Sequence, residues 1–278
     1  MIAIADHVSV MRRGKISFSN NINNTSIEEI AFHIVGDNQK KLTISKNSKN
    51  SLGNTLLNID NLCSKTIKKS QQLRDISLKL KAGQIIGIAG VSGNGQIELL
   101  ECIVGLRKIS KGKIYLQEKN ITNISVFNKR KLGISFVSSD RANEGLCLNS
   151  SIENNAIAGS HRNSPIFNGY ILNRKIIQQI ALERLNNLSI KYGNIHENAS
   201  SLSGGNQQKL VFAREISNKP SILIIAQPTR GVDLNGIKAI HNLIIEFASQ
   251  GGAVLMTSEE IEELQLLSDK IFIISNRR

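Results

Sequence analysis

The sequence lacks long apolar runs, tryptophan and more than a few cysteines, and these shortages exclude several classes of protein. No apolar run approaches the roughly 20 residues that a helix needs to span a bilayer. The start, MIAIADHVSV, has Asp6 where a secretory signal peptide needs cationic residues followed by a longer apolar stretch. We therefore expect a soluble globular protein that reaches a membrane only as a peripheral, cytoplasmic component.

Cysteine and histidine are scarce and are not arranged for bridging or metal binding. Cys63, Cys102 and Cys147 stand in mostly apolar surroundings without paired or metal-ligand spacing, which favours reduced core thiols over a disulfide. The histidines also lack metal spacing, so we predict no metal site. We interpret each of them as an ordinary surface or boundary residue: His7, His33, His161, His196 and His241.

Aromatic residues make up only 4% of the chain, which bears on its excess of positive charge. The net charge of +13 would attract nucleic acid or lipid headgroups if the cations were clustered. They are instead dispersed along the sequence. We expect no nucleic-acid partner, and a nucleic-acid-associated protein stays as an alternative that a strongly salt-dependent affinity for RNA or DNA would support.

An internal repeat links the two ends of the sequence. ADHVSVMRR (residues 5–13) resembles SDKIFIISNRR (residues 268–278), since both have a small residue, Asp, alternating apolar positions and paired Arg. Asp6 and Asp269 are separated by the length of a whole domain plus a connector. We predict that residues 1–15 are the tail of a preceding domain copy, and a chance match of two short strands is the alternative.

The next segment, residues 16–55, has the composition of a connector. It is rich in Asn, Ser and Lys, which disfavours a packed core. One short helix is predicted within it, because Ser26 followed by Glu29 forms a capping box and Gly36 ends a modest apolar stripe.

From Leu56 onward, short apolar runs alternate with helical periodicity, which predicts an α/β domain over residues 56–278 with a largely parallel sheet. Buried strands are expected at residues 84–89, 221–226, 253–257 and 271–275. Helices are expected at residues 96–106, 237–248 and 259–267, and a helical insert at about residues 150–218.

The segment GIAGVSGNGQIELL (residues 87–100) has the context of a phosphate-binding loop, because it follows a strand and opens a helix. Its glycines would let backbone amides hold phosphate oxygens. The Lys and Ser or Thr expected after the last glycine are replaced by Gln96 and Ile97, so the phosphates lose a cation and Mg²⁺ loses a hydroxyl ligand. Alone, the segment also fits a tight turn. The predicted degenerate loop comprises Gly90, Val91, Ser92, Gly93, Asn94, Gly95, Gln96 and Ile97.

The segment LSGGNQQK (residues 202–209) opens an apolar helix, and here the sequence resembles the ABC ATPase family. A serine hydroxyl and free amides at a helix start suit an anion. The resemblance implies that they contact the γ-phosphate of ATP held by a partner domain, so that each ATP lies between two domains. A helix cap with incidental glycines is the alternative. The implied signature loop comprises Leu202, Ser203, Gly204, Gly205, Asn206 and Gln207.

The resemblance covers nearly all of residues 56–278 and implies three further losses. In ILIIAQPTRGVD (residues 222–233), Ala226 and Gln227 stand where active members carry the Mg²⁺-organising Asp and the catalytic Glu. In VLMTSEE (residues 254–260), Ser258 stands where they carry the switch His. We therefore expect no catalytic residue in this chain, while Asp233 would couple the two sites through the D-loop.

The segment SFVSSDRANEGL (residues 135–146) resembles the Pro-Glu-Asp-Arg segment of sugar and nucleoside importers, with Ser138 and Ser139 in place of Pro and Glu. A solvated surface ion pair is the alternative for Asp140 and Arg141. With LSGGNQQK and AQPTRGVD, this segment resembles the second half of double-domain ATPases of monosaccharide and, more closely, nucleoside importers.

The resemblance implies a P-loop NTPase fold of the ABC type, with a mainly parallel sheet, a small antiparallel part and a helical insert. It also implies an importer subunit on the cytoplasmic face of the membrane, with ATP as cofactor and Mg²⁺ at the partner's site. The implied partners are a complete ABC ATP-binding domain, membrane permease subunits and, indirectly, an extracytoplasmic substrate-binding protein. The permease is expected on residues 137–155 and the insert to about Ser200. An inert truncated remnant is the alternative.

Overall fold

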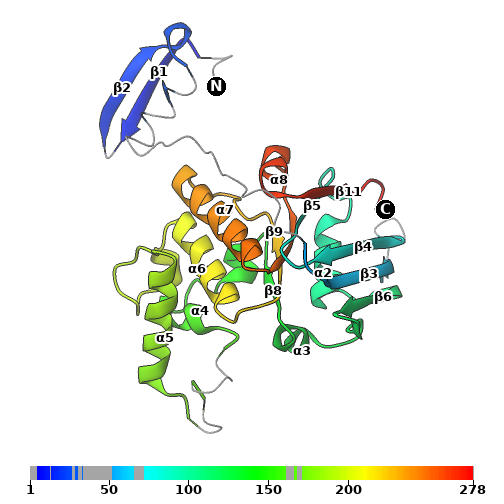
Figure 1. Ribbon diagram of the computed structural model, residues 1–278. Coiled ribbons are helices and arrows are strands. Elements are labelled where there is room, and N and C mark those ends of the chain that lie inside the picture. Colours follow the sequence, from blue (N-terminus) through cyan, green and yellow to red (C-terminus); the bar gives the residue numbers. More distant parts are fainter. Residues whose placement is uncertain are drawn as a thin grey trace. The chain divides into compact units, whose positions relative to one another are not determined.

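The computed structural model describes residues 5–12, 14–26, 29–30, 33, 52–65, 72–160, 166–167 and 171–277. The chain divides into two compact units, Met1–Ser45 and Lys46–Arg278, and Figure 1 shows the elements of each.

The first unit contains a two-stranded antiparallel sheet of β1 (His7–Arg12) and β2 (Lys15–Asn21), followed by the short helix η1 (Ile22–Asn24). All of strand β2 except Lys15 lies within the residues assigned to the connector. The sequence did not predict this strand because KISFSNN is too polar to be recognised as one. Ser26 Oγ accepts a hydrogen bond from the Glu29 N–H at 3.1 Å, as the capping-box spacing predicts. Most of the predicted helix lies outside the described residues.

A five-stranded parallel sheet forms the centre of the second unit, with strand order β11-β5-β10-β9-β8. The three inner strands are almost entirely apolar because both faces of the sheet are covered. Strand β8 has no counterpart among the predicted strands. The five strands are β5 (Ile85–Ala89), β8 (Ile134–Val137), β9 (Ile222–Ala226), β10 (Ala253–Thr257) and β11 (Lys270–Ile273).

A four-stranded antiparallel sheet of order β4-β3-β6-β7 packs on one side of this core. Strand β4 shows why, since Ile76, Leu78 and Leu80 are buried while the residues between them are exposed. The strands are β3 (Thr55–Ser64), β4 (Ile76–Lys81), β6 (Ile109–Leu116) and β7 (Lys119–Asn120).

Helices cover the remaining faces, and the insert of α4, α5 and α6 stands on the side away from the antiparallel sheet (Figure 1). Helix α2 ends before its predicted end, at Val104, because Gly105 caps it with φ of 90°. The helices are α2 (Gln96–Val104), α3 (Val126–Lys131), η3 (Arg141–Gly145), α4 (Ile152–Ile157), α5 (Arg174–Asn187), η4 (Ala199–Ser201), α6 (Gly204–Ile216), α7 (Leu234–Ser249) and α8 (Ile261–Leu267).

The predicted α/β class is confirmed, including the parallel sheet, the antiparallel part and the helices. None of these helices, over the part of the chain that the structure describes, is long and apolar enough to cross a bilayer.

The three cysteines are all free, but they differ in exposure to solvent. Cys63 and Cys102 are core thiols, and burial raises the pKa of Cys102 to about 12. The prediction was wrong for Cys147, which is exposed because its loop between η3 and α4 turns the side chain outward.

Candidate nucleotide loop and signature loop

Three of the predicted motifs meet where parallel strands end. Strand β10 lies between β5 and β9, so the segments that follow Ala89, Ala226 and Thr257 emerge at one edge of the sheet. The Gln227 N–H donates to the Thr257 carbonyl at 2.9 Å, and Gln227 Oε1 accepts from the Glu259 N–H at 3.1 Å. Gln227, predicted from the sequence to replace a catalytic Glu, therefore connects the end of β9 to the segment after β10.

Two hydrogen bonds within the glycine loop between β5 and α2 end on one carbonyl, that of Val91. Gln96 Nε2 donates to the Val91 carbonyl at 3.2 Å, and the Asn94 N–H donates to the same oxygen at 3.1 Å. A Cβ at Gly90 would lie 2.7 Å from Gln96 Nε2 and 2.6 Å from the Ile274 carbonyl oxygen. Gly90 thus stands where Gln96 and Ile274 approach the backbone closely. The side-chain amide of Gln96 is used in a hydrogen bond within the loop.

Arg277 is a cation beside this loop that the sequence did not single out. Its guanidinium donates to the Gly93 carbonyl at 2.5 Å and pairs with Glu98 Oε1 at 3.2 Å. Its own carbonyl accepts from the Arg74 N–H at 2.9 Å. A cavity of about 340 Å³ lies here, lined by Gln72, Arg74, Asn94, Asn276 and Arg277.

These residues suit phosphate oxygens better than Mg²⁺. Guanidinium groups and helix-start amides are donors to anions. Ile97 and Ala226, at the two positions where the resemblance predicts Mg²⁺ ligands, carry no side-chain oxygen. Among the described residues, no cluster of three or more His, Cys, Asp or Glu side chains is placed to hold a metal.

The signature loop opens α6 with a polar surface. Ser203 is the exposed N-cap, and its Oγ accepts from the Asn206 N–H at 3.4 Å and from Asn206 Nδ2 at 3.1 Å. Leu202 is buried and anchors the loop to the core of the insert. The Ser203 side chain is therefore exposed at the positive end of a 13-residue helix.

Gln207 braces this loop from within. Its Nε2 donates to the Leu202 carbonyl at 3.1 Å and to the Ala199 carbonyl at 3.3 Å. The side chain therefore holds the approach to the helix instead of projecting toward a ligand.

Asp140 and Arg141 serve different partners, so the alternative of a mutual surface ion pair is wrong. Asp140 caps η3 by accepting from the Ala142 and Asn143 N–H groups, and the side-chain hydrogen bond from Asn143 is the main cause of its lowered pKa. Arg141 donates to the Arg230 carbonyl at 2.6 Å and to the Gly231 carbonyl at 3.2 Å. The Asp-Arg segment is thereby connected to the D-loop.

A buried polar cluster lies behind the D-loop. Glu263 Oε1 accepts from Thr229 Oγ1 at 2.8 Å and is hydrogen-bonded to His241 Nε2 at 2.7 Å. Burial alone would raise the pKa of Glu263, but hydrogen bonds from His241, Ser258 and Thr229 outweigh it and lower the pKa. Ser258, which the sequence predicts at the switch position, thus belongs to a network that also contains Thr229, directly before the D-loop.

Interpreting every histidine as a surface or boundary residue was wrong for His241. It is buried because α7 turns this position toward α8, where Glu263 pairs with it. His7 and His196 are exposed and His33 is half-buried, whereas His161 lies outside the described residues.

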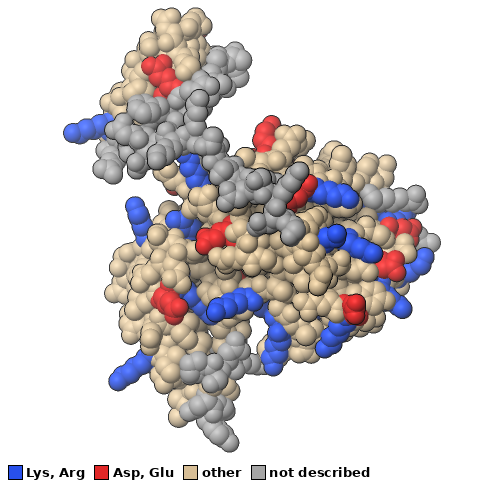
Figure 2. Space-filling model, in the orientation of Figure 1, with Lys and Arg blue, Asp and Glu red and all other residues tan. Residues whose placement is uncertain are grey.

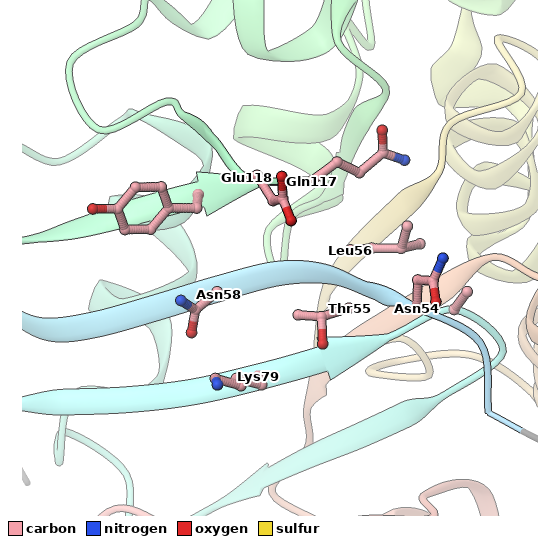
Figure 3. Close-up of a pocket in the computed structure, with 9 residues that line it drawn as sticks. Asn54, Thr55, Leu56, Asn58, Lys79, Gln117 and Glu118 are labelled. Carbon is pink, nitrogen blue, oxygen red and sulfur yellow. The ribbon is translucent and has the colours of Figure 1, made fainter.

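Two further hollows lie away from the nucleotide loop. One, of about 430 Å³, borders α2, α3 and η3 and includes Val104, Leu106, Glu144 and Arg214. The other, of about 1090 Å³, is an open groove on the antiparallel sheet, where Asn58 on β3 and Lys79 on β4 lie on neighbouring strands (Figure 3). None of the predicted nucleotide-loop, signature-loop, D-loop or switch residues lines either hollow, whereas Ser138, Glu144 and Gly145, in the range predicted to receive the permease, line the smaller one.

Charge is mixed over the surface. On the face shown in Figure 2, basic side chains are interspersed with acidic ones and do not merge into one continuous patch. This agrees with the dispersed cations of the sequence.

This fold and these loops define an ATP-binding cassette, and the chain belongs to the ABC transporter family, whose pattern matches residues 73–230. It is 37% identical over 99% of its length to the guanosine import ATP-binding protein NupO of Bacillus subtilis, and 35% identical over 98% to the nucleoside import ATP-binding protein NupA of Lactococcus lactis. It is 34% identical over 98% to the ribose import ATP-binding protein RbsA of Clostridium tetani. These matches cover 54%, 53% and 52% of the relatives, so the chain spans about half their length.

Solved structures show the same fold. A nucleotide-free ATP-binding cassette from an ABC transporter superposes with a TM-score of 0.68 at 20% identity, over 81% of this chain and 89% of that one. A dimeric, post-hydrolysis cassette bound to ADP and Pi superposes with a TM-score of 0.69 at 22% identity, over 80% of this chain and 95% of that one.

Proposed function

We propose that this chain is the non-hydrolysing ATP-binding domain of an importer and completes the ATP site of a partner domain with its signature loop. One contrast carries the proposal. Ser203 is exposed at the start of α6, whereas Gln96, Ile97, Ala226, Gln227 and Ser258 occupy the five positions where a hydrolysing domain has its catalytic and metal-binding groups.

In the composite site, Ser203 Oγ and the amides that open α6 donate to oxygens of the partner's γ-phosphate. Asp233 accepts from the Gly236 N–H at 2.7 Å, which caps α7 and holds the D-loop in place. The general base belongs to the partner, because Gln227 cannot accept a proton from water. Mg²⁺ at the partner's site supplies stabilisation of the charge on the transferred phosphoryl group.

The cargo class follows from the relatives. Their names give guanosine, nucleosides, galactose or methyl galactoside, and ribose as the imported molecules. We therefore assign the chain to an importer of nucleosides or simple sugars on the cytoplasmic face of the membrane, with a permease and an extracytoplasmic binding protein as further components.

The hollow of about 430 Å³ is the proposed docking place of the permease. Leu106, which lines it, is 60% exposed, and the half-buried Val126 and Phe136 add apolar surface. The proposed contact would therefore combine residues of α2 and α3 with Ser138, Glu144 and Gly145 from the range 137–155 expected from the sequence.

We also propose that residues 1–15, at the start of the first unit, are the end of a preceding ABC domain. Support comes from the repeat, since β1 follows Asp6 as β11 follows Asp269. In both strands the second residue, Val8 or Ile271, and the fourth, Val10 or Ile273, are apolar.

The test is ATP hydrolysis with and without a complete first ATP-binding domain. We expect negligible turnover by this chain alone and restored turnover in the mixture. Ser203→Arg should abolish the restoration because the guanidinium fills the anion position, whereas Ser249→Arg, at an exposed serine that ends α7, should leave it intact.

Robust Mg²⁺-dependent turnover by the isolated chain would overturn the proposal, as would full restoration by Ser203→Arg. Failure of the wild-type chain to restore turnover would favour an inert remnant.

A further inference from the structure

Arg141 connects three segments that are distant in sequence. Besides its bonds to the Arg230 and Gly231 carbonyls, its Nε lies 3.4 Å from Gln207 Oε1 on the signature helix. We propose that Arg141 is a positioning residue that clamps the signature loop to the D-loop, so that both meet the partner's ATP site as one unit. This inference rests on the proposed function.

Glycines make room for the clamp. A Cβ at Gly204 would lie 2.8 Å from Arg141 Nη2 and 2.9 Å from the Gly231 carbonyl oxygen. Gly231 has φ of 65°, and a Cβ there would meet Arg141 Nη2 at 3.4 Å. The guanidinium thus lies against the first residue of α6, where a larger residue would displace it or the D-loop carbonyl.

The shape of the group matters as much as its charge. A guanidinium presents five N–H donors in a rigid plane and can reach two carbonyls and an amide oxygen together. An ammonium at the same place would keep the charge but not this geometry.

The turn η3, which carries Arg141, is held against α6. Arg214 on α6 donates to the Gly145 carbonyl at 2.8 Å, and a Cβ at Gly145 would lie 3.3 Å from Val211. Asp140 caps the other end of the turn. Arg141 therefore extends from a turn that is braced at both ends.

The clamp is first tested in the isolated full chain by hydrogen exchange of the backbone amides. Arg141→Met should speed exchange at least about fivefold in both the D-loop, residues 230–236, and the signature loop, residues 203–208, because each loses a shared anchor. Lys238→Met removes an equal charge from α7 and should change neither. Unchanged exchange in either loop would overturn the clamp.

Its effect on the composite site is then measured with the complete partner domain. Arg141→Met should lower kcat about tenfold or more while KM for ATP stays within about twofold, because ATP binds the partner's loop before the signature loop closes on it. Arg141→Lys should lose most of the same rate. A lysine variant with wild-type kcat, or a rise in KM alone, would contradict the positioning role.

A double-mutant cycle with Gln207→Leu checks that the two side chains act together. If Arg141 works through the signature helix, the double variant should be little slower than the slower single variant. Strictly additive losses would contradict this. A wild-type mixture without turnover would disprove the proposed function, whereas the exchange experiment would still decide on the clamp.

Discussion

At the scale of single residues, several side chains at the predicted site hold their own loops together. Gln96 and Gln227, which offer neither a cation nor a base, each make a hydrogen bond that shapes the loop. Glu263 and His241 form a buried pair behind the D-loop, and Ser258 is hydrogen-bonded to the same carboxylate. If the proposed function is correct, these loops keep internal support without hydrolysing ATP.

The buried pair predicts how acid affects stability. The lowered pKa of Glu263 means that the folded state binds this proton less tightly than the unfolded state, in which the pKa is near 4.5. Its stabilising contribution is complete above that pH and is lost as pH falls toward the folded pKa. In urea titrations, Glu263→Gln should be less stable than wild type at pH 7, and the difference should shrink below about pH 4.5.

Removing the partner instead leaves a buried carboxylate without its pair. His241→Ala should therefore lower the free energy of unfolding by about 3–5 kcal/mol at pH 7. A loss below about 1 kcal/mol would show that the pair is not needed to hold Glu263.

At the scale of elements, the end of α2 shows how an unexpected side chain completes a helix. Lys129 is almost fully buried, and its Nζ donates to the Ile103 carbonyl at 2.8 Å, at the end of α2. Burial lowers the pKa of Lys129 to about 8. The amphipathic pattern of α3 could not reveal this, because lysine is ordinarily a surface residue.

Lys129 gives a second, opposite pH dependence. Between about pH 8 and its unfolded pKa of 10.5, the unfolded chain holds a proton that the folded chain has released, so stability rises with pH. The stability of wild type relative to Lys129→Met should therefore increase from pH 8 to pH 10. Chemical denaturation of both proteins at each pH measures this difference, and a constant difference would contradict the buried cation.

At the scale of the whole molecule, the two units differ in how they are stabilised. Both hydrophobic core clusters consist of residues from Leu56 onward, and none of the residues that the structure describes in the first unit belongs to either. The ATP-binding cassette should therefore not depend on the first unit for its stability.

Deletion of residues 1–45 tests this independence. The shortened chain should fold with a Tm within about 2 °C of the full chain, because it keeps both clusters. Circular dichroism melting curves compare the two. A markedly lower Tm would show that the first unit stabilises the cassette.

Much of the fold was predictable because its signals are local. Strands β5, β9 and β10 are short apolar runs bounded by polar residues, and their alternation with helices indicates a parallel sheet. The start of α7 was missed because periodicity begins at Ile237, whereas the cap that starts the helix is Asp233. Strand β8 is only four residues long, too short for a reliable pattern.

The residue types at each motif, including Gln96, Ile97, Ala226, Gln227 and Ser258, were determined by the sequence alone. Only the tertiary structure decided that Arg141 lies between the D-loop and the signature loop, that Arg277 contacts the glycine loop, and that His241 pairs with Glu263. The physical reason is that motif chemistry depends on residues adjacent in the chain, whereas these contacts join segments that meet only when the core packs.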